Sequence, residues 1–176
     1  QIEPRVLAHL ADYQALLSIF SSGKDAYSAF GAQMFGIPDL SKETHPTLRQ
    51  SAKSALLGCG YGMGWASFAA QLLTGFLGND FQTNDDYMTK LFDIPHTCTD
   101  EELFIHALCA KKIISIYRET SQPVVEFWNL CSQLIEYSLY KGKPYEYKCL
   151  TFDKERILLP GGLALKYPDL MFEPIA

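Results

Sequence analysis

Apolar residues recur at helical spacing along most of the chain, and glycine or proline interrupts this pattern at intervals. The first segment, "IEPRVLAHLADYQALLSIF", has apolar residues near helical period from Val6 to Phe20, which predicts one helix. Gly23 is expected to end that helix, Asp25 to cap the next one and Gly36 to end it. Further helices are expected at "THPTLRQSAKSALLG", "WASFAAQLLTGFLG", "LFIHALCAKKIISIYRET" and "PVVEFWNLCSQLIEYSLYKG", with a short one around Tyr87 to Phe92. This pattern restricts the chain to a predominantly helical fold.

The end of the chain follows a different pattern. The segment "YEYKCLTFDKERILLPGGLALKY" alternates as strands do, and Pro160-Gly161-Gly162 has the composition of a turn. A β-hairpin is therefore expected near the C-terminus. Helices followed by a small sheet element give an α+β fold that is predominantly α-helical.

Composition excludes several classes of protein. With 176 residues, 48% of them apolar and 13% aromatic, the chain can bury a core and is unlike a disordered tail. The net charge of -5 argues against a protein that coats nucleic acid everywhere, although a local basic site is compatible with it. Five cysteines without a C-x-x-C pair indicate reduced thiols in a cytoplasmic protein. No apolar run approaches the roughly 20 residues of a membrane span, so no membrane partner is expected.

The segment "THPTLRQSAKSALLGCGYGMG" carries two cations on one helical face. Arg49, Lys53, Leu57 and Tyr61 follow one another at intervals of four, and each such step drifts by only about 40° around an α-helix. Arginine offers a planar fork and lysine a point charge, so the pair can bind a polyanion of triphosphate size. A solvated basic face is the alternative, because two basic residues at this spacing are common. We call these four residues the α-helical stripe.

Glycines occupy every second position at the end of this segment, at Gly58, Gly60, Gly62 and Gly64. Each glycine costs about 1 kcal/mol if it is helical, which usually marks a close backbone approach, a hinge or a required turn. The sequence "GCGYGMG" fits neither G-x-G-x-x-G nor the P-loop pattern. An anion site is therefore expected on the helix side chains.

These residues resemble those of a known family. "RQSAKSALLGCGYGMG" resembles the nucleotide-binding helix of family A DNA polymerases, whose pattern is Arg, three residues, Lys, three residues, an aromatic residue or Leu, three residues, then Tyr-Gly. "QIEPRVLAHLAD" resembles the end of that family's first palm motif, and two motifs in the right order are more specific than either alone. "GKDAYSAFGAQMFG", "YRETSQPVVEFW" and "ILLPGGLALKYP" resemble segments of phage-type members, so the resemblance covers essentially the whole chain. It implies a DNA-directed DNA polymerase, a nucleotidyltransferase that extends a primer from dNTPs.

The resemblance implies a role for each residue of the stripe. Arg49 and Lys53 would bind the triphosphate of the incoming dNTP as catalytic residues, and Lys53 would donate a proton to the departing pyrophosphate. Tyr61 would lie beside the nascent base pair and the template base, and Gly62 would let the template strand come close. Leu57 stands where the best-known members have Phe or Tyr. Leucine occurs at this position among viral relatives, which favours a phage source and leaves sugar discrimination open.

Three further residues complete the implied nucleotide site. Glu3 would be the steric gate that excludes a ribose 2′-hydroxyl. Gln1 would lie near the nucleotide and the primer end, and Tyr27 takes the place of a phosphate-contacting His or Tyr. Leu163 stands where the family has Arg, so one contact with template or primer is expected to be lost.

The family's chemistry uses two Mg²⁺ ions held by two aspartates, which the resemblance places before Gln1 and after Ala176. Asp12, Asp25 and Asp39 are better explained as caps or loop residues. The chain is therefore expected to be a piece of a polymerase, inactive alone, whose partners are dNTP, primer–template DNA and the rest of the polymerase chain.

The resemblance also divides the chain into three parts. Residues 1–22 would lead from the palm to the fingers, residues 23–130 would form the fingers with the nucleotide-binding helix at about 46–62, and residues 131–176 would return toward the palm. A phage source would place the protein in the cytoplasm of a host bacterium. The alternative from another class is a non-catalytic helical module that binds nucleotides or protein partners and merely shares the Arg–Lys pair.

Other reactive side chains are expected to be structural. The four histidines have no metal-ligand spacing with the cysteines. Cys59 has no base at a recognisable spacing, so a small packing residue is expected there. Trp65 and Phe68 could stack on bases but fit a core better at helical spacing. Lys111 and Arg118 fit either a DNA backbone or a solvated face.

Overall fold

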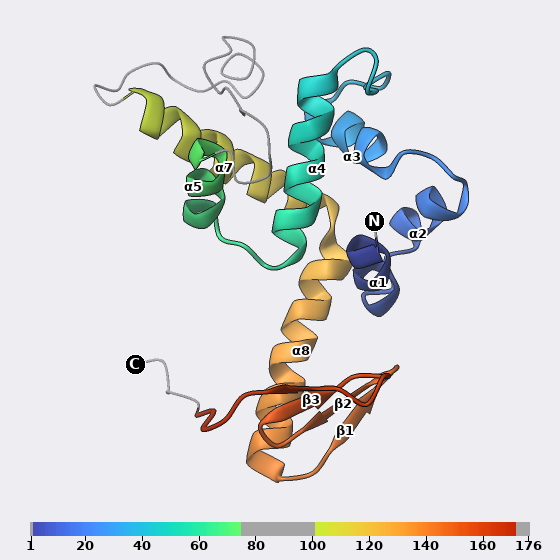
Figure 1. The fold of residues 1–176 in the computed structure, drawn as a ribbon, viewed down its shortest axis with the longest axis vertical. Helices are drawn as coiled ribbons and strands as arrows, with labels where there is room; N and C mark the ends of the chain where they lie inside the picture. The colour runs from blue at the N-terminus through green and yellow to red at the C-terminus, as the bar shows by residue number, and fades with distance from the viewer. Residues whose placement is uncertain (1, 75–100, 172–176) are drawn as a thin grey trace. The chain divides into compact units, whose positions relative to one another are not determined.

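The computed structural model describes residues 2–74 and 101–171 (Figure 1). Within these ranges the chain forms seven α-helices and one four-stranded antiparallel sheet, which confirms the predominantly helical α+β class. The helix expected around residues 87–92 lies outside the described residues. The chain divides into two compact units, Gln1–Val124 and Val125–Ala176. The three-part division drawn from the resemblance stays a prediction.

The expected first helix is in fact two helices, α1 (Ile2–Leu10) and α2 (Gln14–Ser21), so the prediction of one helix was wrong. The chain turns a corner between them, where Asp12 adopts a left-handed backbone with φ of 53°. The Tyr13 hydroxyl donates a hydrogen bond to the carbonyl oxygen of Thr120 at 2.8 Å. This contact with a distant helix fixes the corner, although the apolar pattern runs through it without interruption.

The third helix, α3 (Ala26–Phe35), begins and ends where the sequence predicts. Asp25 is its N-cap, and its Oδ1 accepts a hydrogen bond from the backbone N–H of Tyr27 at 3.1 Å. Gly36 closes the helix in the left-handed conformation with φ of 67°, which glycine adopts without a steric cost. Both boundary predictions and the capping role of Asp25 are confirmed.

The fourth helix, α4 (Pro46–Gly60), packs closely against α3. A Cβ atom at Gly31 of α3 would lie only 3.0 Å from the Cβ of Ala52 of α4, so the two helices meet where one of them has no side chain. Helix α4 ends at Gly60, and Gly62 follows it with φ of 74°. The helix expected at about 46–62 is therefore present and ends slightly earlier.

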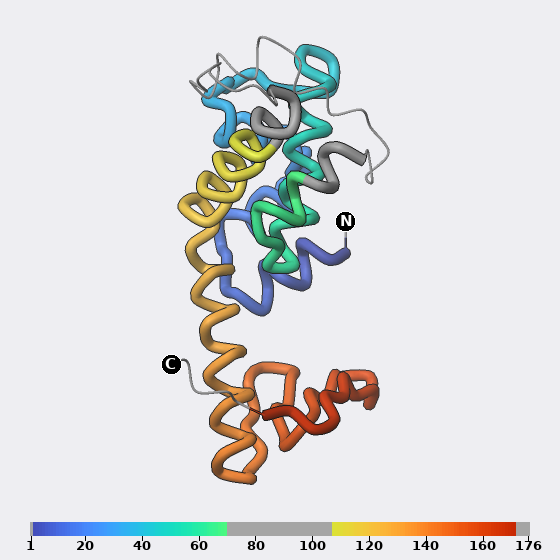
Figure 2. Tube along the Cα trace, turned by 90° about the vertical axis from the view of Figure 1, so that its left-hand side faces the viewer, coloured from blue at the N-terminus to red at the C-terminus, as the bar shows by residue number. Residues whose placement is uncertain are grey.

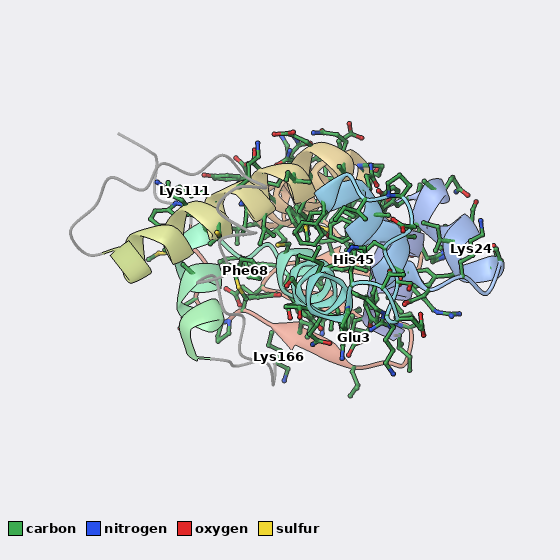
Figure 3. All side chains as sticks on the ribbon, turned by 90° about the horizontal axis from the view of Figure 1, so that it is seen from above. Glu3, Lys24, His45, Phe68, Lys111 and Lys166 are labelled. Atoms are coloured by element: carbon green, nitrogen blue, oxygen red, sulfur yellow. The ribbon has the colours of Figure 1, made fainter. Side chains whose placement is uncertain are left out.

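Helices α5 (Trp65–Thr74) and α7 (Glu101–Thr120) lie side by side and close the core of the first unit (Figures 1 and 2). Phe68 and Tyr117 are each 1% exposed, and Figure 3, which looks along α4, shows Phe68 between α5 and α4. The expected core position of Phe68 is confirmed. The same expectation was wrong for Trp65, which is 43% exposed and lies under the ammonium group of Lys111 at 4.3 Å from the ring centroid.

The second unit contains most of α8 (Gln122–Lys141) and a sheet with the strand order β1-β2-β3-β4. Register places Tyr145, Phe152, Ile157 and Leu165 on one face. Tyr137 of α8 meets Tyr145 edge-on at 6.0 Å between ring centroids, so the helix covers that face. The strands are β1 (Tyr145–Tyr147), β2 (Leu150–Asp153), β3 (Arg156–Leu158) and β4 (Ala164–Lys166).

The predicted hairpin corresponds to β3 and β4, which pair in antiparallel register. Its turn closes through a hydrogen bond from the backbone N–H of Leu159 to the carbonyl oxygen of Leu163 at 2.8 Å, and Gly162 has φ of 79°. The turn at Pro160-Gly161-Gly162 is therefore confirmed. The sheet is larger than the prediction because β1 and β2 extend it.

The cysteines of the described residues, Cys59, Cys109, Cys131 and Cys149, are free thiols. No described helix combines the length and apolar character that crossing a bilayer requires.

Candidate functional site

The α-helical stripe lies on α4 and its C-terminal cap, Tyr61. The opposite face of α4 is buried against the rest of the first unit, through residues such as Ser51 and Ala55. Along the stripe, Arg49, Lys53 and Leu57 are partly exposed, and the Tyr61 side chain is 73% exposed. The structure thus presents two cations, an aliphatic side chain and an aromatic ring in order along one helix.

A groove with a volume of about 370 Å³ runs between α1 and the C-terminal half of α4. It brings together three of the residues singled out in the sequence: Glu3 from α1, and Leu57 and Tyr61 from the stripe. Gly60 permits this close packing of the two helices, because a Cβ there would lie 3.2 Å from a methyl carbon of Leu7. The residues that line the groove are Ile2, Glu3, Pro4, Val6, Leu7, Leu10, Leu56, Leu57, Gly60 and Tyr61.

Arg49 lies next to two residues of the α3 N-terminus. Its Nε donates a hydrogen bond to Asp25 Oδ2 at 2.5 Å, and its guanidinium carbon lies 5.4 Å from the ring centroid of Tyr27. Burial raises the pKa of Asp25, but hydrogen bonds from Arg49, from the Ser28 hydroxyl and from the Tyr27 backbone outweigh it, so the pKa lies below its ordinary value. Asp25 is therefore ionised near neutral pH, and it neutralises part of the charge of Arg49.

Tyr27 is almost completely buried, with 6% of its surface exposed. Burial raises the pKa of its hydroxyl, the positive charge of Arg49 lowers it, and the carboxylates of Asp25 and Glu3 raise it further. The net effect is a raised pKa, so the hydroxyl stays protonated. The last of these contributions to the pKa comes from Glu3, which also lines the groove.

The remaining expected site residues are Gly62, Lys53 and Gln1. Gly62 has a left-handed backbone with no heavy atom within 4 Å of where a Cβ would stand, so its surroundings are open. Lys53 forms no ion pair with any residue that the structure describes. Gln1 lies outside the described residues. The link between Asp25 and Arg49 was not predicted, because an N-cap gives no local signal for a partner on another helix.

The described carboxylates do not fit a site for two Mg²⁺ ions. No group of three or more His, Cys, Asp or Glu side chains in those ranges could hold a metal ion. Asp25 is committed to Arg49, and Asp12 and Asp39 are exposed loop residues. Cys59 is also unsuited to nucleophilic chemistry, because burial raises its pKa to about 12, which supports the predicted packing role.

Comparison with known proteins addresses the family directly. The model of the family described as DNA polymerase family A matches residues 1–93, which is more than half of the 176 residues. The chain is 41% identical over 63 residues to the thermostable DNA polymerase I of Thermus thermophilus, a match that covers 36% of this chain and 7% of that protein. It is 37% identical over 93 residues to the thermostable DNA polymerase I of Thermus filiformis, covering 52% of this chain and 10% of that one.

A eukaryotic relative, DNA polymerase theta of Drosophila melanogaster, is 38% identical over 72 residues, with 41% of this chain and 3% of that protein covered. The matched part of the chain thus spans a tenth or less of the length of these relatives. A search of the solved structures finds no match. The family model covers the whole stripe, the groove and the Asp25–Arg49 pair. The chain belongs to DNA polymerase family A.

Proposed function

We propose that this chain carries the nucleotide-binding part of a DNA-directed DNA polymerase, with the incoming dNTP along α4 and the template strand beside Tyr61. One observation carries the proposal. The stripe offers cations, then an aliphatic side chain, then an aromatic ring, and its last two members share a groove with Glu3. A dNTP presents a triphosphate, a sugar and a base in the same order.

At the phosphate end, Arg49 and Lys53 offer complementary cations. The guanidinium is a planar fork suited to phosphate oxygens, whereas the ammonium is a compact charge on a flexible stem. Negative charge grows on the leaving pyrophosphate as the bond between the α- and β-phosphates breaks, and fixed cations stabilise it. The ammonium of Lys53 then supplies the proton that the leaving oxygen takes up.

At the sugar and base end, the groove provides a steric and an aromatic surface. Glu3 of α1 faces the same groove as Leu57, so a carboxylate and an aliphatic side chain are available to exclude a ribose 2′-hydroxyl. The exposed ring of Tyr61 can pack against a base pair. Gly62 leaves open space next to it, which supports a close approach by the template strand.

The metal ions that this chemistry needs are not assigned to the described residues. We infer that carboxylates outside those ranges hold the two Mg²⁺ ions, because the described ones offer no suitable set. Because its matched part spans a tenth or less of the length of its polymerase relatives, the chain alone is proposed not to polymerise DNA. Its proposed partners are dNTP, primer–template DNA and further parts of the polymerase.

The test is single-turnover primer extension by the polymerase that carries this chain. Lys53→Ala should slow incorporation about a hundredfold or more, as loss of a charge-stabilising group does at other active sites. Lys42→Ala, which removes the same charge from the exposed loop before α4, is the matched control and should leave the rate unchanged. An unchanged rate in Lys53→Ala would refute the role. If the full-length protein that carries this chain binds dNTP but extends no primer, the non-catalytic module is favoured instead.

A further inference from the structure

We propose that Asp25 is a positioning residue for the nucleotide: its carboxylate orients the guanidinium of Arg49 so that the terminal edge faces the triphosphate. This inference rests on the proposed function and deepens it. The capping role of Asp25 explains its place at the start of α3, but not its bond to the side chain of Arg49 on α4. That bond joins residues 24 positions apart in the sequence.

The guanidinium group of Arg49 has contacts on one edge, to Asp25, and on one face, to the Tyr27 ring. Nε–H is bound to Asp25 Oδ2 at 2.5 Å, and the Tyr27 ring lies 5.4 Å from the guanidinium carbon. A guanidinium has five N–H donors, and the four on its terminal nitrogens make no hydrogen bond to a described residue. The terminal edge is thus left for a bidentate acceptor such as a phosphate.

Asp25 is itself held firmly. Its Oδ2 also accepts a hydrogen bond from the Ser28 hydroxyl at 2.7 Å, and its Oδ1 accepts one from the Tyr27 backbone. The two side chains of the pair are 19% exposed at Arg49 and 34% exposed at Asp25, so water competes only in part for the bond. An arginine fixed in this way loses less rotamer freedom when it meets a phosphate than a freely rotating one.

Asp25 has two opposing effects on a bound triphosphate. Its negative charge weakens the attraction between Arg49 and the phosphates, but its hydrogen bond keeps the guanidinium in the orientation that the reacting phosphates need. Removal of the carboxylate should therefore leave nucleotide affinity unchanged or higher and slow the chemical step. A purely structural role would instead weaken affinity and rate together.

Asp25→Asn tests this division in the polymerase that carries this chain. Asparagine caps a helix about as well as aspartate, so α3 keeps its start, but the ionic acceptor for Arg49 is lost. We expect single-turnover incorporation at saturating dNTP to fall about tenfold or more, because small misplacement of a binding group is costly. The dissociation constant of dNTP should not rise. Asp25→Ser, which also caps well, should behave alike, and Asp39→Asn, which removes the same charge from an exposed loop, should behave as wild type.

The Arg49→Ala background separates this inference from the proposed function. If Asp25 acts through Arg49, Asp25→Asn should have no further effect on the rate once Arg49 is absent. An unchanged rate in Arg49→Ala would overturn the proposed function. If Arg49→Ala is slow, three results would overturn the positioning role alone. The first is a wild-type rate in Asp25→Asn, and the second is independent effects of the two substitutions on the rate. The third is an equal loss of dNTP affinity and of rate in Asp25→Asn.

Discussion

Gly31 and Gly58 form a matched pair for testing how closely α3 and α4 pack. An alanine at Gly31 would put its Cβ 3.0 Å from the Cβ of Ala52 and 3.0 Å from a methyl carbon of Leu40. The Ala52 Cβ is attached directly to the backbone of α4 and cannot rotate away, so the two helices must separate. An alanine at Gly58 would come no closer than 3.6 Å to any atom, at the ring of Phe68, which is ordinary van der Waals contact.

The two substitutions should change the free energy of unfolding in opposite directions. Replacing a helical glycine by alanine contributes about 0.5–1 kcal/mol, because alanine loses less backbone entropy on folding. Gly58→Ala should therefore raise the free energy of unfolding by about that amount. Gly31→Ala has the same gain, but overpacking of a dense core costs about 1–3 kcal/mol. Its net effect should be a loss of about 1–2 kcal/mol.

Urea unfolding of the 176-residue chain, followed by circular dichroism, measures both effects. Gly60→Ala is a useful intermediate, because the atom it would meet, at 3.2 Å, is the end of the flexible Leu7 side chain and can move. If Gly31→Ala stabilises the chain as much as Gly58→Ala does, the close packing of α3 on α4 is refuted. In Gly31→Ala, the separation of α3 from α4 should also slow nucleotide incorporation, because the Asp25–Arg49 bond joins the same two helices.

Three other predictions follow from the site and its surroundings. Leu57→Phe should change the discrimination among deoxy-, dideoxy- and ribonucleotides in primer extension, because the ring would enter the groove that Glu3 lines; identical selectivity would mean that this position does not face the sugar. Burial raises the pKa of Cys59 to about 12 and that of Cys109 to about 11, so a thiol reagent near neutral pH should label exposed Cys149 much faster, as mass spectrometry would show; equal labelling would contradict their burial. The pKa of Asp25 is lower in the folded chain than its ordinary value of 3.8, so the stability it contributes is present above that value and is lost as the pH falls through the lower folded value. The difference in unfolding free energy between wild type and Asp25→Asn should accordingly shrink in acid, and a constant difference would argue against the pair.

Features that depend on a few neighbouring residues could be predicted from the sequence. Asp25 and Gly36 mark the ends of α3 because capping and left-handed closure are local events. The turn that contains Gly162 is equally local. The corner at Asp12 escaped prediction because its fixing contact, from Tyr13 to Thr120, joins residues 107 positions apart. Propensity and periodicity carry no information about such a partner.

The candidate site also has features that the sequence could predict and features that it could not. The order of Arg49, Lys53 and Tyr61 along one helix followed from their spacing. The groove between α1 and α4 required packing, because its depth depends on how closely Leu7 approaches Gly60. The exposure of Trp65 also required packing, since its helical spacing predicted a core position and only the structure shows it at the surface beside Lys111.

The bond from Tyr13 to Thr120 has a consequence for synthesis on the ribosome. A growing chain that has reached Thr74 already contains every residue of the stripe, but it lacks α7, the helix whose Tyr117 and Ile113 complete the core beside α4. The corner between α1 and α2 also has no acceptor until Thr120 has been made. The first unit therefore cannot finish folding in step with translation of its N-terminal half. Helices α4 and α5 can complete their packing only after α7 has left the exit tunnel.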